Sequence, residues 1–300
     1  MSADGAASRN VRLDLSYEGT EFHGFGVQPD RRTVQEVLEE ALARSLGERV
    51  RLVVAGRTDA GVHASGQVVS FSTRGRLPAP DLARAANARL PDDVHVHGAA
   101  EMPPAFDARR SALRRHYSYL IWSHTRPNLW LRRWSWHLTD RPDVAAMQAA
   151  ANRLVGTHDF ASFLGHRSQE PSARTTVRAV ERATWWIDGD LIGFEITANA
   201  FLRHMVRGIV GTLIEVGRGR LEPAQFGSIL EAADRRQAGA NAPPHGLMLT
   251  GVDYPDEFEL PAPTTAQVND FQQRGPWWRP GDRSSVRSDE IGGGRATGVS

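Results

Sequence analysis

The stretch RLVVAGRTDAGVHASGQVVSFST, residues 51–73, contains two apolar segments separated by a turn rich in glycine. Residues 51–55 and 67–73 have the pattern of β-strands, so we expect a strand on each side of the turn. The turn places one carboxylate, Asp59, two residues after Arg57 and two residues before a glycine. Because glycine has no Cβ, another molecule can approach this backbone closely. An ionised aspartate in such a place is available as a nucleophile or a base. The alternative is a plain turn in which Asp59 hydrogen-bonds its own backbone and Arg57 points to solvent.

The segments on either side of this stretch alternate between strand and helix patterns. Residues 11–17 alternate apolar and polar side chains as a half-buried strand does. A helix is predicted from residue 34, because Thr33 and Glu36 have the spacing of a capping box, and Gly47 is expected to end it. Further helices are expected at 81–90, 144–154, 201–216 and from Pro223 onward, and further strands at 94–100, 115–122, 177–187, 191–198 and 247–254. Strands and helices mixed in this way in both halves indicate an α+β protein.

The composition excludes several classes of protein. The 300 residues are 40% apolar and 24% charged, which is ordinary for a soluble globular chain. No apolar run reaches the roughly 18 residues that cross a bilayer, and residues 1–9 lack the apolar core of a signal peptide, so we expect a cytoplasmic protein. There is no cysteine, which excludes disulfides, thiolate nucleophiles and cysteine-based zinc sites. All 36 basic residues are arginine, which excludes a P-loop lysine and Schiff-base chemistry.

A basic segment lies between residues 108 and 139, although the net charge of the whole chain is only +1. It has no acidic residue and carries seven arginines, which are Arg109, Arg110, Arg114, Arg115, Arg126, Arg132 and Arg133. Aromatic residues are interleaved with them, namely Tyr117, Tyr119, Trp122, Trp130, Trp134 and Trp136. Guanidinium groups bind phosphate and aromatic faces stack on bases, so this mixture suits RNA with unpaired nucleotides. A solvated strand pair beside a core edge rich in tryptophan fits the composition equally well.

A series of short motifs runs in order from about Val11 to Pro255. They are YEGT at 17–20, GRTDAGVHA at 56–64, RHYSY at 115–119, GTHDF at 156–160, ANAFLRHMVR at 198–207 and HGL at 245–247. In this order they resemble the TruA family of tRNA pseudouridine synthases. The resemblance implies two ferredoxin-like halves that share one continuous, mainly antiparallel sheet, with helices on one face and a basic cleft on the other. We therefore expect a disordered leader at 1–9, an N-terminal half at 10–105 with the catalytic loop, a C-terminal half at 106–256 and a disordered tail at 257–300.

The activity that the resemblance implies is isomerisation of uridine to pseudouridine in the anticodon stem-loop of tRNA (tRNA positions 38 to 40), by a homodimer that needs no cofactor and no metal. The nucleophilic aspartate of the family falls on Asp59, and the arginine before it on Arg57. The active-site tyrosine falls on Tyr117, the helix arginine that pairs with the carboxylate on Arg207, and an apolar pocket position on Leu247. We add Arg109, Arg114 and Arg115 of the basic segment as expected tRNA contacts.

The chemistry suits one carboxylate. The bond from uracil N1 to the ribose must break, the base must turn, and a bond must form through C5, with no redox step. The base must also leave its stack, and the aromatic face of Tyr117 can offset part of that cost.

Three other functions compete with this interpretation. A tRNA-binding protein or RNA chaperone without catalysis would gain nothing from a carboxylate that repels phosphate. A hydrolase built from Asp59, His63 and Ser65 is disfavoured, because the three lie within seven residues of one another, whereas such triads are normally assembled from separate loops. His95 and His97 fall on one side of a strand and could hold a metal, but no third ligand follows at a recognisable spacing.

Overall fold

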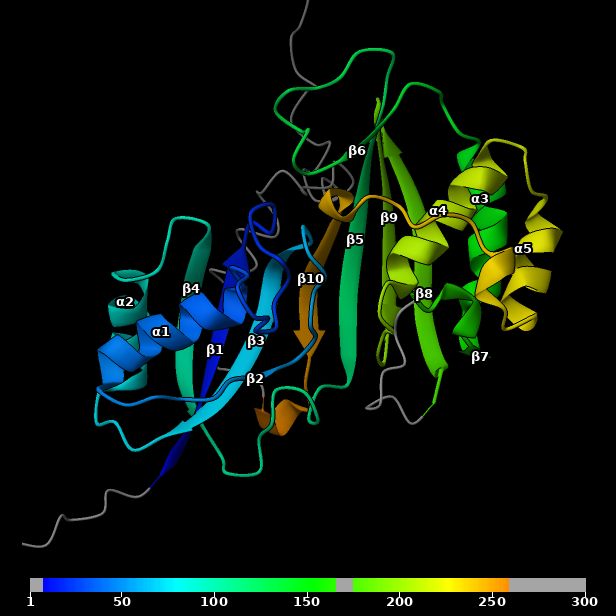
Figure 1. Ribbon diagram of the computed structural model, residues 1–300. Coiled ribbons are helices and arrows are strands. Elements are labelled where there is room, and N and C mark those ends of the chain that lie inside the picture. The colour runs from blue at the N-terminus through cyan, green and yellow to red at the C-terminus, as the bar shows by residue number, and fades with distance from the viewer. Residues whose placement is uncertain (1–7, 166–174, 259–300) are drawn as a thin grey trace, which may run out of the picture.

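The computed structural model describes residues 8–165 and 175–258. Its strands form one ten-stranded sheet with the order β4-β1-β3-β10-β5-β9-β8-β7, and β2 and β6 pair with β3 and β5 beside this path (Figure 1). The strand pairs among these residues are antiparallel apart from β3–β10 and β5–β6. The expected α+β architecture with one continuous, mainly antiparallel sheet is therefore confirmed.

Each half of the sheet has the ferredoxin-like strand order, in which the fourth strand lies beside the first. The N-terminal half has the spatial order β4-β1-β3-β2 and consists of β1 (Arg9–Tyr17), α1 (Val34–Leu46), β2 (Val53–Val54), β3 (His63–Thr73), α2 (Ala79–Asn87) and β4 (Val94–Met102). The C-terminal half has the order β10-β5-β9-β8 and consists of β5 (Arg114–Ser123), α3 (Val144–Ala151), β8 (Val177–Asp188), β9 (Leu191–Ala198), α4 (Met205–Gly217), α5 (Pro223–Glu231) and β10 (Leu247–Asp253). Two short strands that the sequence did not predict, β6 (Trp136–Leu138) and β7 (Gly156–Asp159), extend it. The halves meet where β3 and β10 pair in parallel at His63–Ala64 and Met248–Leu249.

The helices lie in two groups, with α1 and α2 over the N-terminal half and α3, α4 and α5 over the C-terminal half (Figure 1). The main core fills the space between the helices and the sheet, and joins side chains such as Leu13 of β1, Leu38 of α1, Phe194 of β9 and Leu213 of α4. A smaller cluster that includes Phe106 and Tyr254 forms a second core. The two helix groups leave the central strands β3, β10 and β5 between them.

Several helix and strand ends differ from those expected. Gly47 ends α1 as predicted, with a left-handed backbone and an N–H that donates to the Ala43 carbonyl. The capping box at its start is wrong, because Thr33 makes no side-chain cap bond and its hydroxyl is buried without a partner. Helix α4 begins at Met205 rather than at residue 201, because a left-handed residue, His204, precedes it. Strand β2 is shorter than predicted, whereas β3 begins at His63 instead of residue 67.

Regular secondary structure reaches slightly past both of the expected ends of the fold. Arg9 opens β1, so the sheet begins inside the segment expected as a leader. At the other end, Asp256–Phe258 forms a 3₁₀ turn, and the Phe258 ring lies 5.3 Å from that of Phe106. The rest of the predicted leader and tail lies outside the described residues. Within the described ranges, no helix is both long enough and apolar enough to cross a membrane.

Candidate active site

Buried polar side chains of β1 and β3 hold the loop between β2 and β3 in place. The Gln67 amide nitrogen donates to the Gly56 carbonyl over 2.8 Å and to the Tyr17 hydroxyl over 3.2 Å. The Tyr17 hydroxyl is also hydrogen-bonded to Thr58 Oγ1 at 2.7 Å, and the Thr58 carbonyl accepts from the Phe25 N–H at 3.1 Å. Because Thr58 is held from both its side chain and its main chain, the following residue, the predicted catalytic one, has a fixed backbone.

Asp59 begins a tight turn that ends at the start of β3. The Val62 N–H donates to the Asp59 carbonyl over 3.1 Å, and Gly61 has φ of +77° at the third position. That conformation favours glycine, and a Cβ there would also lie 3.0 Å from Cγ of Pro244. The turn is therefore present as predicted. In the described part of the chain, however, the Asp59 carboxylate makes no hydrogen bond to its own backbone.

The carboxylate of Asp59 faces the N-terminal end of α4 instead. Its Oδ2 atom lies 3.5 Å from His204 Nε2 and 3.6 Å from Arg207 Nη1. The Arg207 Nε donates to the Ala242 carbonyl over 2.7 Å, which fixes the direction of its guanidinium group. The side chain of Asp59 is 22% exposed, so a substrate can reach it.

Tyr117 of β5 lies at the floor of the same site. Its side chain is 8% exposed, and its ring meets that of Phe201 edge to face with the centroids 5.0 Å apart. A Cβ on Gly56 would lie 3.8 Å from the Tyr117 hydroxyl oxygen, so the catalytic loop passes directly over this group. Burial raises the pKa of Tyr117 well above that of a free phenol, and the nearby Tyr17 and Asp59 raise it further. At neutral pH the group is therefore a hydroxyl donor and not a base.

Leu247 also comes to the part of the sheet that carries Tyr117. It opens β10 and is buried opposite Tyr119, while Leu249 pairs with Tyr117. Side chains two apart on a strand point the same way, so Leu247 faces the side of the sheet on which Tyr117 lies.

Arg57 lies on the catalytic loop but not against the carboxylate. It is exposed, its stem passes Gly26, and it has no hydrogen bond or ion pair with any described residue. Of the two arginines expected beside Asp59, the structure brings only Arg207 to it.

The three arginines expected to contact tRNA are placed very differently. Arg115 is buried, and its guanidinium group donates to four main-chain carbonyls, those of Ala55, Arg109, Ala112 and Asn199. The side chain of Arg114 points to the opposite face of the sheet from that of Arg115. It pairs with Glu181 at 2.7 Å and with Asp253 at 3.5 Å. Arg109 is exposed on the surface, whereas the exposed part of Arg114 is held in these ion pairs.

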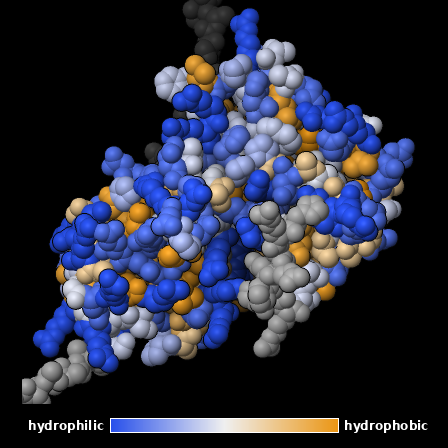
Figure 2. Space-filling view, in the orientation of Figure 1, coloured by the Kyte–Doolittle hydropathy of each residue, from blue (hydrophilic) through white to orange (hydrophobic). Residues whose placement is uncertain are grey.

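The site lies on the face of the sheet that carries the helices. Tyr117 shares one side of β5 with Tyr119 and Ile121, which belong to the main core under the helices, and Arg207 comes from α4 itself. Figure 2, in the orientation of Figure 1, shows hydrophilic residues in the hollow between the two halves. The placement expected for the cleft, on the face opposite the helices, therefore differs from the structure. The physical reason is that the two helix groups stand apart and leave the central strands open between them.

The histidines considered for other functions have structural partners. His63 is buried, its Nδ1 accepts from the Gly19 N–H at 2.9 Å, and its Nε2 donates to the Arg133 carbonyl over 2.8 Å. Burial lowers its pKa, so it is neutral with both nitrogens engaged, and the hydrolase alternative lacks its base. His97 is hydrogen-bonded to the hydroxyl of Ser16 at 2.8 Å. No cluster of three or more possible metal ligands occurs among residues 8–165 and 175–258.

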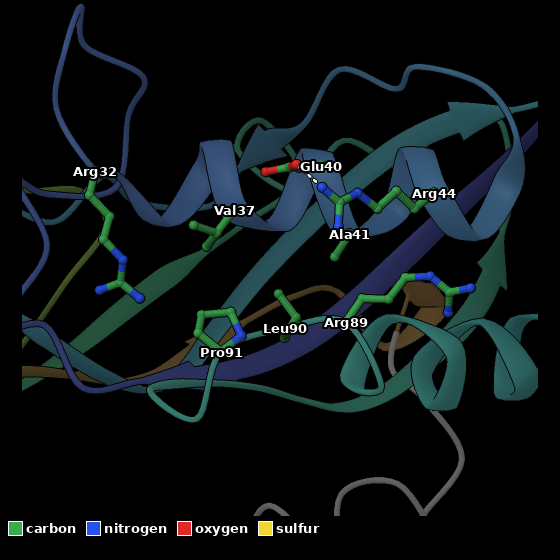
Figure 3. A pocket seen from close by; sticks show the side chains of 8 residues that line it. All are labelled: Arg32, Val37, Glu40, Ala41, Arg44, Arg89, Leu90 and Pro91. Carbon is green, nitrogen blue, oxygen red and sulfur yellow. Dashed lines mark hydrogen bonds and ion pairs between the residues drawn. The ribbon is translucent and has the colours of Figure 1, made fainter.

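A surface pocket of about 330 Å³ lies between α1 and the end of α2 (Figure 3). Three arginines line it, but each has a partner. Arg32 pairs with Asp93 through two bonds of 2.8 Å, Arg44 pairs with Glu40, and Arg89 donates to the Ala85 carbonyl. The residues of the catalytic loop do not line this pocket, so it is separate from the site around Asp59.

The sequence analysis assigns no role to His204, although this residue is part of the motif ANAFLRHMVR. The signal that could have found it is its distance of three residues from Arg207, since residues three apart near a helix start lie on one side of the chain.

Comparisons with known proteins show which family this chain belongs to. The family described as tRNA pseudouridine synthase matches residues 15–109 and 150–255. A tRNA pseudouridine synthase A of Pelobacter propionicus is 44% identical over 82% of this chain and 100% of its own. Those of Chloroflexus aurantiacus and Bacillus subtilis are 47% and 41% identical, over 82% and 81% of this chain and 89% and 98% of theirs. The solved Cbf5–Nop10–Gar1 complex has a TM-score of 0.35 at 12% identity over 88% of this chain and 65% of that one, too distant a likeness to bear on the site. The chain belongs to the tRNA pseudouridine synthase A family, isomerases that convert uridine in tRNA to pseudouridine.

Proposed function

We propose that Asp59 attacks or deprotonates the ribose of a uridine in the anticodon stem-loop of tRNA. The observation that carries this proposal is the accessible Asp59 carboxylate, paired through one oxygen with Arg207, on a loop whose Gly56 lies beside the Tyr117 hydroxyl. The Arg207 guanidinium group beside the carboxylate fixes its direction, and a nucleophile or a base needs a fixed direction.

The reaction needs only groups of this kind. The bond between N1 and C1′ breaks, the uracil turns, and a bond forms between C5 and C1′, while the C5 proton is lost and N1 gains one. No electrons leave the substrate, so the isomerisation is balanced without an oxidant or a reductant. Because the uridine must leave its stack, at a cost of a few kcal/mol, exposed groups near the site have to stabilise the opened RNA.

Arg57 and Arg109 are the exposed arginines that we assign to RNA contact, with Arg57 orienting the target or filling the gap left by the base. Trp130 extends this assignment along the basic segment, because its side chain is 90% exposed and can stack on an unpaired base. The loop that carries it is anchored near the site, since the Trp134 ring lies 4.4 Å from that of His63. The homodimer, the independence from cofactors and the cytoplasmic location stay predictions from the resemblance and the composition.

The test of Asp59 compares Asp59→Asn and Asp59→Ala with Asp81→Ala, which removes an exposed carboxylate from α2. The Asp59 variants should bind tRNA about as well as the wild type and form no pseudouridine, because a carboxylate contributes little to phosphate binding. The Asp81 variant should retain full activity. Pseudouridine formed by either Asp59 variant would show that the assignment of Asp59 is wrong. Pseudouridine mapped outside the anticodon stem-loop would refute only the proposed position on tRNA.

The noncatalytic alternative and the phosphate contacts are tested by binding. Arg109→Ala should weaken tRNA binding and reduce the salt slope by about 0.9 for one lost phosphate contact. Arg114→Ala is the matched control, because Arg114 lies on the opposite side of β5 and is already paired with acidic residues. Equal losses in both variants would contradict the assignment of Arg109 as a phosphate contact.

A further inference from the structure

His204 has an unusual backbone conformation directly before α4. Its φ is +64°, which is left-handed and unfavourable for a residue with a Cβ. The residue that precedes a helix usually caps it through its side chain, but His204 makes no such bond. Strained backbone of this kind concentrates at functional sites, because the surrounding structure must enforce it. The strain therefore calls for a reason other than the start of the helix.

The imidazole is turned toward the catalytic carboxylate. Its Nε2 atom lies 3.5 Å from Oδ2 of Asp59, and this contact joins α4 to the loop between β2 and β3. On the other edge of the ring, a Cβ on Gly165 would lie 2.3 Å from Nδ1. Only glycine fits at position 165 with the ring in this place, so the chain leaves room for the imidazole on the side away from Asp59.

Both partners of the Asp59 carboxylate approach the same oxygen. The closest approaches of His204 and Arg207 are both to Oδ2, at 3.5 and 3.6 Å. These distances are longer than hydrogen bonds, as contacts in a site without substrate often are. Two donors on one side of a carboxylate fix its rotation and leave Oδ1 as the oxygen that can face the substrate.

The charged groups around His204 favour its neutral form. Burial lowers the pKa of His204, and Arg207, Arg203 and Arg235 lower it further, while Asp59 acts in the opposite direction. At neutral pH the ring is therefore uncharged and offers one N–H. A neutral donor can orient the carboxylate without neutralising it as strongly as a second cation would.

We propose that His204 is a positioning residue that holds Oδ2 of Asp59 together with Arg207, so that Oδ1 is aimed at the ribose of the uridine. The left-handed backbone at residue 204 brings the imidazole to the carboxylate. This inference rests on the proposed role of Asp59 and adds to it the choice of the attacking oxygen.

The test uses His204→Gly and His204→Asn, since both replacements tolerate the left-handed conformation. We expect kcat to fall by about tenfold to a hundredfold, because a small misplacement of a reacting group has effects of that size. The affinity for tRNA should not change, and the melting temperature should stay the same or rise. Ala233→Gly is the matched control, because it relieves a left-handed residue with φ of +50° that is exposed and not part of the site, and it should keep full kcat.

Two readouts separate positioning from a merely structural role. Imidazole added to His204→Gly should restore part of kcat, and the acid limb of the wild-type kcat profile should be absent in His204→Asn. A kcat of His204→Gly within about twofold of the wild type would overturn the proposal. So would a loss of kcat that follows the loss of melting temperature and is not restored by imidazole. If Asp59→Asn is inactive while His204→Gly is fully active, only this inference fails, whereas an active Asp59→Asn refutes the proposed function itself.

Discussion

The role of Arg115 gives the sharpest test of how the two halves are held together. Its guanidinium group makes five hydrogen bonds of 2.7 to 3.2 Å to carbonyls of Ala55, Arg109, Ala112 and Asn199. Ala55 lies before the catalytic loop, Asn199 lies just after β9, and Arg109 lies in the connection between the halves. Arg115 therefore links three segments that are distant in sequence, and we expect its loss to destabilise the fold rather than to weaken RNA binding directly.

The magnitude follows from the carbonyls that Arg115→Ala would leave without this donor. The bonds to the Ala55 carbonyl are buried and those to the other three carbonyls are half-buried, so about 1 kcal/mol for each of the four gives about 4 kcal/mol. For a domain of this size class, about 2 to 4 °C of melting temperature is lost per kcal/mol, which predicts a decrease of about 8 to 16 °C. Arg115→Lys should lie between the wild type and Arg115→Ala, because one ammonium group cannot reach all four carbonyls.

The assay is thermal unfolding together with tRNA binding measured well below the transition. Arg114→Ala is the control that removes the same charge, and it should melt close to the wild type, because the ion pairs of Arg114 are exposed to solvent. The reasoning is refuted if Arg115→Ala melts within about 2 °C of the wild type, that is within about 1 kcal/mol, and binds tRNA more weakly. That result would restore Arg115 as a substrate contact, as the sequence suggested.

Four further predictions follow from particular residues. Thr33→Val should leave the free energy of unfolding, measured by urea titration, unchanged or raise it, because the Thr33 hydroxyl is buried without a partner. A decrease of about 1 kcal/mol in that free energy would instead show that Thr33 caps α1. Gly61→Ala should lower kcat more than tRNA affinity, as measured by single-turnover kinetics and filter binding, because a Cβ at φ of +77° must shift the Asp59 turn; an unchanged kcat would contradict this. Burial, and to a smaller extent the nearby His95, lowers the pKa of His97 to about 4. Between about pH 6.5 and pH 4, His97 is therefore protonated in the unfolded chain and neutral in the folded chain. Stability should therefore fall as pH decreases from about 6.5 to 4, and urea titrations of His97→Gln should show a smaller fall than the wild type. The pKa of Tyr117 is raised, so kcat of the wild type should show no basic limb from this residue up to about pH 9, and a limb that disappears in Tyr117→Phe would refute its assignment as a permanent donor.

Much of the architecture could be predicted from local patterns. Alternating apolar residues located most strands, and Gly47 marked the end of α1, because these signals act between neighbours in the chain. The glycine-rich turn around Asp59 was equally readable, since only glycine suits the conformation at position 61. The capping box failed because Thr33 became buried, and a spacing in the sequence does not report burial.

The candidate site depended on contacts between distant segments. The parallel pairing of β3 with β10 and the antiparallel pairing of β10 with β5 bring the loop of Asp59 over Tyr117, and no local pattern specifies these registers. The separation of the two helix groups likewise placed the site on the helical face, against expectation. The exposure of Arg57 and the approach of His204 to Asp59 are outcomes of the same packing.

The sequence by itself determined the elements, the catalytic turn and the family resemblance, because each is written in short segments of adjacent residues. Tertiary structure alone decided what each arginine does. Arg114 and Arg115 are neighbours of the same residue type, yet one is an exposed ion-pair partner and the other a buried donor to four carbonyls. The physical reason is that successive side chains on a strand point to opposite faces of the sheet, and only the packed structure assigns each face its surroundings.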